Sequence, residues 1–363
     1  MELTENEYWY WFVNISRVGR ITRNRLLSIY KCPKNLFHAD AKEIKSYKWL
    51  TEAQKNNIII KDVDAVKKGY MYLKQKNIHF THVNSPLYPD RLMNILDKPH
   101  VLYYKGMDIN STNNTVAIVG SRRCSEYGRR TAYNIARELA GCGIDVISGL
   151  AYGIDSAAHK GCLEGNGMTH AILGCGVNVC YPQSNIELYM NILDKGSVIS
   201  EYHPDAGPLA GYFPERNRLI SGLSDVLVIV EAGEKSGSLI TVDCALEQGK
   251  DILAVPGRID DVFSKGCNEL IKMGAQLYSN INDIFDYLDR TKIQCKCEKN
   301  QNKNIFLATE EKMLYANLCF EPKHINVIAK ESDMDIEQAI RVIFNLERKK
   351  IIRQTTVNCY VKV

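Results

Sequence analysis

Short apolar runs that end in small residues alternate with helical segments through the middle of the chain. VAIVG begins at Val116, DVISG at Asp145 and HAILG at His170, and SVISE, DVLVIVEA and DILAVPG follow after further helical stretches. Near-continuous apolar strands that alternate with helices are typical of a parallel sheet covered on both faces. The sequence therefore predicts an α/β fold with a doubly wound, Rossmann-like parallel sheet, which ends after a helix from Ile281 to Leu288.

Different patterns flank the predicted sheet. Apolar positions three and four residues apart predict an all-α module over residues 1–75, in which ISRVGRITRNRLL forms either a simple helical hairpin or a helix-hairpin-helix (SAM-like) arrangement. Residues 76–110 read as proline-punctuated extended chain that opens a Rossmann-like domain spanning residues 76–290. The polar stretch 291–304 predicts a linker, and three helical patterns followed by two short strands predict a winged-helix domain over residues 305–363.

Composition excludes several classes of protein. The 363 residues, 45% of them apolar, suffice for at least one large core, so the chain is no small disulfide-stapled scaffold. No apolar run approaches the roughly 20 residues that cross a bilayer, and we expect no membrane contact. The N-terminal stretch MELTENEYWYWF carries acids where a targeting signal carries bases, so we expect a cytoplasmic protein.

The cysteines indicate reduced thiols. Most are scattered singly through apolar segments, where a thiol packs as a small apolar group, as we expect for Cys142, Cys162, Cys244 and Cys319. The one close pair, Cys295 and Cys297, has poor spacing for zinc and no partner pair, so we expect free thiols and no metal.

Charge is distributed unevenly along the chain. The net charge of +4 arises from +7 in residues 1–110, −7 in residues 111–290 and +4 in residues 291–363. A nucleic-acid site in the acidic middle must therefore rest on local arginines and backbone amides, because no overall basic field is present there.

The loops after the predicted strands are rich in glycine and serine. In open α/β sheets the ligand binds outside the carboxyl ends of the strands, and glycines at helix starts expose amides that attract anions. We therefore expect a phosphate-bearing ligand. The candidate contacts in these loops are Gly120, Ser121, Arg122, Arg123, Ser148, Gly149, Gly153, Gly174, Ser236, Gly237 and Ser238.

Nucleotide cofactors fit these loops poorly. No G-x-G-x-x-G opens the first helix, and the second strand ends in Ser148 and Gly149 where a dinucleotide site needs a carboxylate for the ribose. A G-x-x-x-x-G-K-[ST] loop is absent too, so the sequence offers no machinery for ATP hydrolysis. We expect no cofactor.

Arginines and aromatic residues accompany the glycine loops. Arg122 and Arg123 lie in the first loop, and Phe213 precedes Arg216 and Arg218 in YFPERNR. Guanidinium groups bind phosphate oxygens and exposed rings stack with unpaired bases, a combination typical of proteins that bind single strands. Residues two apart point to different sides of a helix, so we expect one of Arg216 and Arg218 to face the ligand and the other to have a structural partner.

Five long stretches resemble the DNA-processing protein DprA family, also called Smf. They are VAIVGSRRCSEYG, ISGLAYGIDSAAHKGCL, FPERNRLISGLSDVLVIVEA, SGSLITVDCALEQGKDILAVPG and SKGCNELIKMGA, in the family's order. The resemblance implies a protein without catalysis that binds and protects incoming single-stranded DNA, forms homodimers and loads the RecA recombinase onto DNA during natural transformation.

The resemblance also implies particular contacts. The family's G-S/T-R phosphate-binding motif falls on Gly120, Ser121 and Arg122, and the aromatic residue of its F-x-x-R-N-R motif falls on Phe213. The chain departs from many relatives at two positions that often hold lysine, which are Gln183 after Tyr181-Pro182 and Ala210 before the aromatic residue.

Two other functions are open on the residues alone. Nucleotide phosphoribohydrolases share such a sheet but carry a P-G-G-x-G-T-x-x-E loop, where this chain has EAGEKSGSLITVD. Glu231 there is better explained as a hydrogen-bond acceptor at the strand end, and Asp155 as a helix cap rather than a metal ligand with His159. The third predicted helix of residues 305–363 starts among acids, which favours protein contact over DNA.

Overall fold

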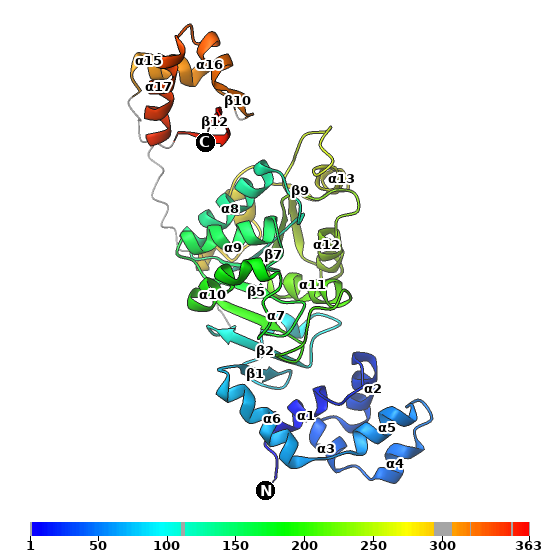
Figure 1. Ribbon diagram of the computed structural model, residues 1–363. Coiled ribbons are helices and arrows are strands. Elements are labelled where there is room, and N and C mark those ends of the chain that lie inside the picture. Colours follow the sequence, from blue (N-terminus) through cyan, green and yellow to red (C-terminus); the bar gives the residue numbers. More distant parts are fainter. Residues whose placement is uncertain (1, 110–112, 294–306, 320, 350, 363) are drawn as a thin grey trace. The chain divides into compact units, whose positions relative to one another are not determined.

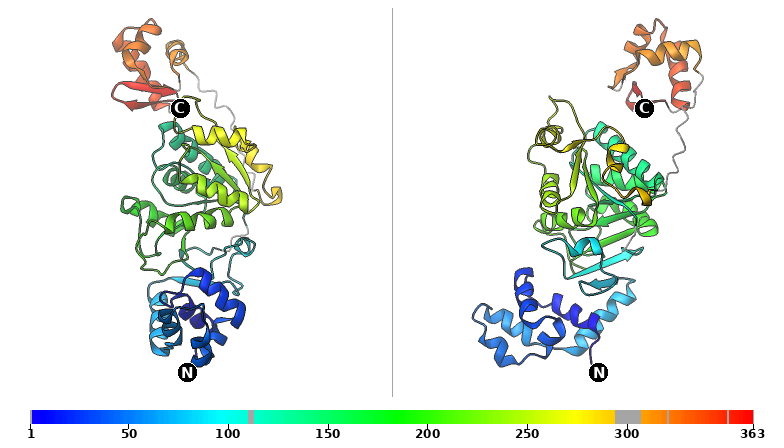
Figure 2. Two further views of the ribbon diagram at one scale, coloured as in Figure 1. Left: turned by 90° about the vertical axis from the view of Figure 1, so that its right-hand side faces the viewer. Right: turned by 180° about the vertical axis from the view of Figure 1, so that it is seen from behind.

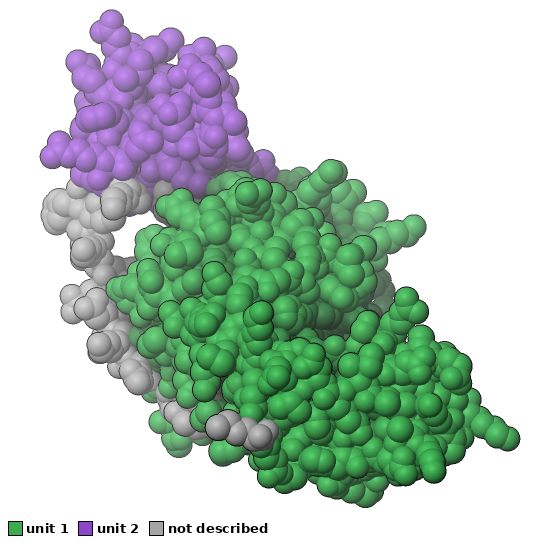
Figure 3. Space-filling model, turned by 60° about the horizontal axis from the view of Figure 1, so that its bottom comes forward, with its two compact units in different colours: residues 1–296 green, residues 297–363 purple. Residues whose placement is uncertain are grey.

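The chain forms two compact units in the computed structural model, Met1–Lys296 and Cys297–Val363 (Figure 3). The structure describes residues 2–109, 113–293, 307–319, 321–349 and 351–362. Most of the predicted linker 291–304, with Cys295 and Cys297, lies outside these ranges. None of the helices within them combines the length and the apolar character that a membrane crossing requires.

The first unit contains one large sheet whose strands run mostly parallel, as predicted. The strand order is β1-β2-β6-β5-β4-β3-β7-β8-β9 (Figure 1). Every pairing from β6 to β9 is parallel. These strands are β3 (Thr115–Val119), β4 (Asp145–Ser148), β5 (Thr169–Ile172), β6 (Ser197–Ser200), β7 (Val226–Ile229), β8 (Asp251–Ala254) and β9 (Gln276–Leu277).

The prediction of extended chain over residues 76–110 was incomplete. This segment contains β1 (His79–His82) and β2 (Val101–Gly106), and β2 pairs antiparallel with β6 at the sheet edge. The prolines that suggested irregular chain lie between the strands, and the partner of β2 is far away in the sequence. The sheet therefore contains parallel and antiparallel strands, and residues 76–110 contribute two of its strands.

Helices cover both faces of the sheet (Figure 2). Side chains alternate along each strand, so Val116 and Ile118 of β3 pack on one layer while Ala117 and Val119 pack on the other. The first layer contains α8 (Glu126–Gly141), α9 (Ile154–Glu164) and α14 (Asn282–Phe285), which is shorter than the predicted helix. The second layer contains α7 (Asp90–Met93), α11 (Tyr212–Leu223), α12 (Ser238–Glu247) and α13 (Lys265–Lys272). The unit also contains α10 (Ile186–Lys195) and two short 3₁₀ segments, η1 (Gln183–Asn185) and η2 (Arg290–Lys292).

Six helices fill the described residues before the sheet. Their apolar side chains share a core with the sheet edge, where the ring of Trp9 stacks on His82 with 5.2 Å between centroids and the ring of Phe12 packs edge-on against His100 at 5.9 Å. Thr4 and Thr51 start two of the helices through capping boxes. The six are α1 (Glu5–Val13), α2 (Arg20–Tyr30), α3 (Pro33–His38), α4 (Ala41–Ser46), α5 (Glu52–Ile59) and α6 (Val63–Gln75).

The second unit has its own core, in which Leu314, Ile328 and Leu346 are fully buried. Its sheet has the order β10-β12-β11, one strand more than the two predicted. The elements are α15 (Thr309–Asn317), β10 (Lys323–His324), α16 (Ile325–Glu331), α17 (Ile336–Arg348), β11 (Ile352–Thr356) and β12 (Cys359–Lys362).

The described cysteines are free thiols. Cys142 and Cys162 are buried as predicted, but Cys244 is half-buried and Cys319 is exposed. The prediction for these last two was wrong because neither position faces a core: neither belongs to a buried cluster of its unit.

Candidate nucleic-acid interface

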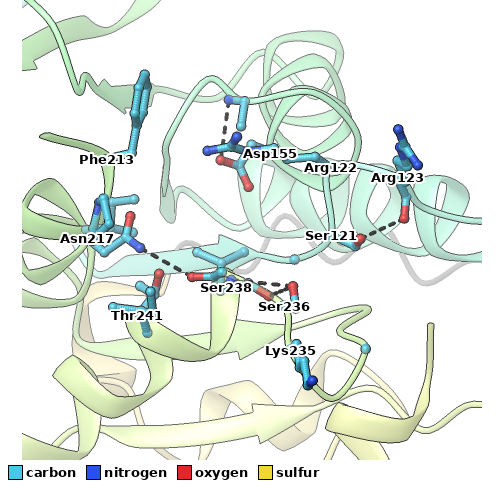
Figure 4. A pocket seen from close by; sticks show the side chains of 18 of the residues that line it. Ser121, Arg122, Arg123, Asp155, Phe213, Asn217, Lys235, Ser236, Ser238 and Thr241 are labelled. Atoms are coloured by element: carbon cyan, nitrogen blue, oxygen red, sulfur yellow. Dashed lines mark hydrogen bonds between the residues drawn. The ribbon is translucent and has the colours of Figure 1, made fainter. Parts of the chain in front are cut away.

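The strand order places the candidate site at a switch in direction. From β3 the chain proceeds through β4, β5 and β6 on one side, and then through β7 and β8 on the other side of β3. The loops after β3 and β7 therefore separate and leave a crevice at their carboxyl ends. A cavity of about 860 Å³ lies there, lined by the loop after β3, the loop after β7 and the start of α11 (Figure 4).

The loop after β3 is fixed from two sides. The Ser121 amide donates to the Glu231 carbonyl at 2.7 Å, and the Ser121 carbonyl accepts from the Ile154 amide at 3.3 Å. Gly153, with φ of 77°, approaches so closely that a β-carbon there would lie 2.4 Å from the Ser121 carbonyl oxygen. Only glycine combines that conformation with that contact. The tight packing holds Gly120 and Arg122 at the cavity wall.

An aromatic wall faces this loop. Phe213, the second residue of α11, is half-buried and packs against Gly174, where a β-carbon would lie 2.7 Å from its ring. The ring of Tyr181 lies 5.3 Å away between centroids. The exposed Arg122 guanidinium stands 5.5 Å from the centroid of the Phe213 ring, within the range of a cation–π contact. Arg122 thus links the glycine loop to the aromatic surface.

Arg216 lines the cavity although its side chain is buried. One terminal nitrogen donates to the Gly149 carbonyl at 2.8 Å and also to the Ile172 carbonyl. Burial lowers the pKa of Arg216 to about 10, and the nearby Asp155 carboxylate opposes that shift. The group remains charged at neutral pH, and its Nε has no hydrogen-bond partner among the described residues.

Arg218, which was also predicted as a ligand contact, occupies a different environment. Its two terminal nitrogens donate to the two carboxylate oxygens of Glu201 at 2.9 and 2.7 Å, and it does not line the cavity. The side chains of this pair are only 9% and 14% exposed. Arg216 therefore lies at the cavity, whereas Arg218 lies in a structural pair.

Four other predicted contacts lie behind the cavity rather than on its surface. The buried Ser148 hydroxyl donates to the Ile118 carbonyl at 2.7 Å and joins β4 to β3. Gly149, Gly153 and Gly174 have no side chain, which leaves room for close contact with Arg216, Ser121 and Phe213, respectively. These positions shape the cavity, whereas the lining includes Gly120, Ser121, Arg122, Arg123, Phe213, Arg216, Ser236, Gly237 and Ser238 from the prediction.

The start of α12 forms the opposite wall. Gly237 is its N-cap, and the hydroxyls of Ser236 and Ser238 are hydrogen-bonded at 2.8 Å. An exposed lysine, Lys235, precedes them in the lining, and sequence analysis missed it although it adjoins the Ser-Gly-Ser stretch. The prediction also missed Tyr181, Asn217, Thr241, Val262 and Phe263. Asn217 and Thr241 lie beside predicted contacts on α11 and α12, whereas Val262 and Phe263 belong to a segment that gave no local signal.

Two carboxylates that suggested enzyme chemistry have structural partners. Buried Glu231 accepts from the amide and the hydroxyl of Ser125, the N-cap of α8, and does not line the cavity. Asp155 is not the cap of α9, because Gly153 holds that position; it accepts from the Gly149 and Ala151 amides at 3.1 and 3.4 Å. Burial raises the pKa of Asp155, and Arg216 with these amides opposes the shift.

His159 also has a structural contact. Its Nδ1 is hydrogen-bonded to the Thr169 hydroxyl at 2.7 Å, and burial lowers the pKa of His159 to about 3. The imidazole is therefore neutral. Within the described ranges, no group of three or more His, Cys, Asp and Glu side chains is placed to hold a metal ion.

Comparisons with known proteins agree on one family. Residues 79–289 match the family model for DNA recombination-mediator protein A. Protein Smf of Escherichia coli is 34% identical over 78% of this chain and 77% of its own length. The crystal structure of DNA processing protein A from Streptococcus pneumoniae matches with a TM-score of 0.69 and 32% identity, over 80% of this chain and 99% of that chain. A structure of DNA processing protein A from Helicobacter pylori, described for its single-stranded DNA binding mode, matches with a TM-score of 0.52 and 32% identity, over 58% of this chain and 98% of that chain.

Proposed function

Because this chain belongs to the DNA recombination-mediator protein A family, we propose that it binds single-stranded DNA in the cavity between the loops after β3 and β7. The observation that carries the proposal is the position of Arg122, between the glycine loop and the Phe213 ring. One nucleotide presents a phosphate and a base to its binding site, and this arrangement offers a guanidinium for the first and a ring for the second.

The remaining lining supports a strand rather than a single nucleotide. Lys235 and the start of α12 offer a second cationic wall, whereas the charge of buried Arg216 lies beside the Asp155 carboxylate. Together these groups supply local charge inside a segment that is acidic overall, so affinity depends on defined contacts more than on a diffuse field.

Family membership supports a proposal about the wider role of the chain. We propose that the chain acts as a recombination mediator in the cytoplasm, where it protects incoming single strands, loads RecA onto them and works as a homodimer. The helices of residues 1–75 would form an all-α module, and α15–α17 with the sheet β10-β12-β11 would form a winged-helix domain. The boundaries at residues 75/76, 290/291 and 304/305 belong to this proposal.

The chain is expected to bind single strands in preference to duplex. Stacking on Phe213 requires an unpaired base and contributes about 1–3 kcal/mol per base, so duplex loses that part of the affinity. Competition of a labelled oligonucleotide against unlabelled single strand and duplex of equal length, at physiological salt, measures the preference. If the duplex competes equally well, the proposed stacking of a base on Phe213 is contradicted.

The alternative function as a nucleotide phosphoribohydrolase predicts a different result. The strand-end carboxylate Glu231 is held by Ser125 outside the cavity, so we expect no release of free base from nucleoside monophosphates. Chromatography of the incubated nucleotides detects any base. Turnover that disappears in Glu231→Gln would favour the enzyme, whereas turnover unchanged in that variant would identify a contaminant.

A further inference from the structure

The helix α17 carries an exposed apolar stripe. Ile336, Ile340 and Phe344 are 51%, 51% and 64% exposed, and they recur every four residues, so they lie along one side of the helix. The core of the second unit is filled from another side of α17 by Ala339, Val342, Ile343 and Leu346. Contiguous apolar surface of this kind marks a contact with another protein surface. We refer to Ile336, Ile340 and Phe344 as the α17 stripe.

Charged residues beside the stripe have complementary signs. Glu337 and Arg341 each follow a stripe residue, both are exposed, and neither makes an ion pair within the described part of the unit. They are four residues apart on one side of the helix, about 6 Å along its axis. The helix also begins with acids, because Asp335 is its N-cap. A polyanion is therefore a poor occupant for this face.

The complementary charges point to the occupant. When two identical helices pack antiparallel across a two-fold axis, a side chain near one end of the contact faces a side chain near the other end of the second copy. With the axis near the middle of the Glu337–Arg341 pair, Glu337 of each copy lies beside Arg341 of the other. The same alignment places the two copies of the stripe against each other.

We propose that the α17 stripe is a self-association surface, on which a second copy of this chain docks through an antiparallel α17 pair. The stripe supplies the apolar centre and two Glu337–Arg341 pairs form its rim, the distribution found in protein interfaces. This surface lies in the second unit, so it is separate from the cavity of the first unit and joins chains in addition to any contact made there.

Sedimentation velocity of the full chain over a concentration series tests the apolar centre. The unchanged chain is expected to show an association step beyond any contact made by the first unit, and Ile340→Glu is expected to weaken that step by roughly tenfold or more. Val357→Glu is the matched control, because Val357 is 82% exposed in the same unit but lies outside α17. Equal association of the unchanged chain and Ile340→Glu would overturn the proposal, as would an equal loss in Val357→Glu.

Charge exchange tests the antiparallel arrangement. Glu337→Arg alone and Arg341→Glu alone place like charges opposite each other and are each expected to weaken the step by roughly tenfold. An equimolar mixture of the two variants restores both pairs between unlike chains and is expected to recover the step. A mixture that behaves as the average of its components would exclude a second copy as the occupant.

Binding of single-stranded DNA by Ile340→Glu separates this inference from the proposed function. The variant is expected to bind an oligonucleotide too short for two copies with unchanged affinity. If the unchanged chain does not bind the oligonucleotide, the proposed function is contradicted, but the association result is not affected.

Discussion

Replacement of Arg122 by alanine is expected to weaken the binding of single-stranded DNA by about 10- to 150-fold. The estimate corresponds to one charge-assisted contact of about 1.5–3 kcal/mol, made by an exposed guanidinium in a loop that is held in place by other residues. One lost phosphate contact also lowers the slope of log affinity against log salt by about 0.7. Fluorescence anisotropy over a salt series measures both quantities, and thermal melts show whether the variant is folded.

Two further arginine variants distinguish a defined contact from diffuse charge. Arg122→Lys retains the charge but loses the forked geometry, so it recovers only part of the affinity. Arg129→Ala removes an exposed arginine from α8 that lies near Glu126 and outside the cavity lining, and it should change the affinity little. An equal loss in Arg129→Ala would show that the arginines act only as a general positive field.

Replacement of Arg218 by alanine is expected to lower the free energy of unfolding by about 3–5 kcal/mol. The variant leaves the largely buried Glu201 carboxylate without its bidentate partner, and an uncompensated buried charge carries a penalty of this size. Urea denaturation followed by circular dichroism measures the change. DNA affinity of the folded fraction should be retained, because Arg218 does not line the cavity.

A double variant provides the control for this stability prediction. Arg218→Met combined with Glu201→Leu removes both charges and keeps much of the apolar volume, so most of the lost stability should return. A loss below about 0.5 kcal/mol in Arg218→Ala would mean that the pair behaves as an exposed ion pair. A double variant as unstable as the single one would assign the loss to packing instead.

The parts of this molecule that follow local rules could be predicted from the sequence. Parallel strands buried on both faces give continuous apolar runs, so the strand from Val116 to Val119 and the other parallel strands could be recognised. The family model confirms the resemblance that the sequence motifs indicated. Gly120 and Arg122 follow a strand directly, so the rule for open sheets found them. Helix periodicity predicted that Arg216 and Arg218 point to different sides of their helix, but it did not indicate which of them lies at the cavity.

The remaining features depend on partners that are distant in the sequence. Strand β2 looked like irregular chain because its partner β6 is about ninety residues further on, and no local pattern indicates that pairing. Ser148 looked like a ligand contact because its loop is rich in small residues, yet its hydroxyl is used between two strands. Val262 and Phe263 reach the cavity from a segment whose sequence gives no reason to place it there.

The antiparallel edge of the sheet has a consequence for synthesis of the chain. Gly106 at the end of β2 pairs with Ser197 in β6, and the core that Trp9 and Phe12 share with β2 also contains Leu188 and Val198. Roughly ninety residues must leave the ribosome between the two strands, which takes about 5–20 s at typical rates of translation. During that interval the edge of β2 that later pairs with β6 has no partner strand, so this edge is the part of the nascent chain that is open to incorrect pairing.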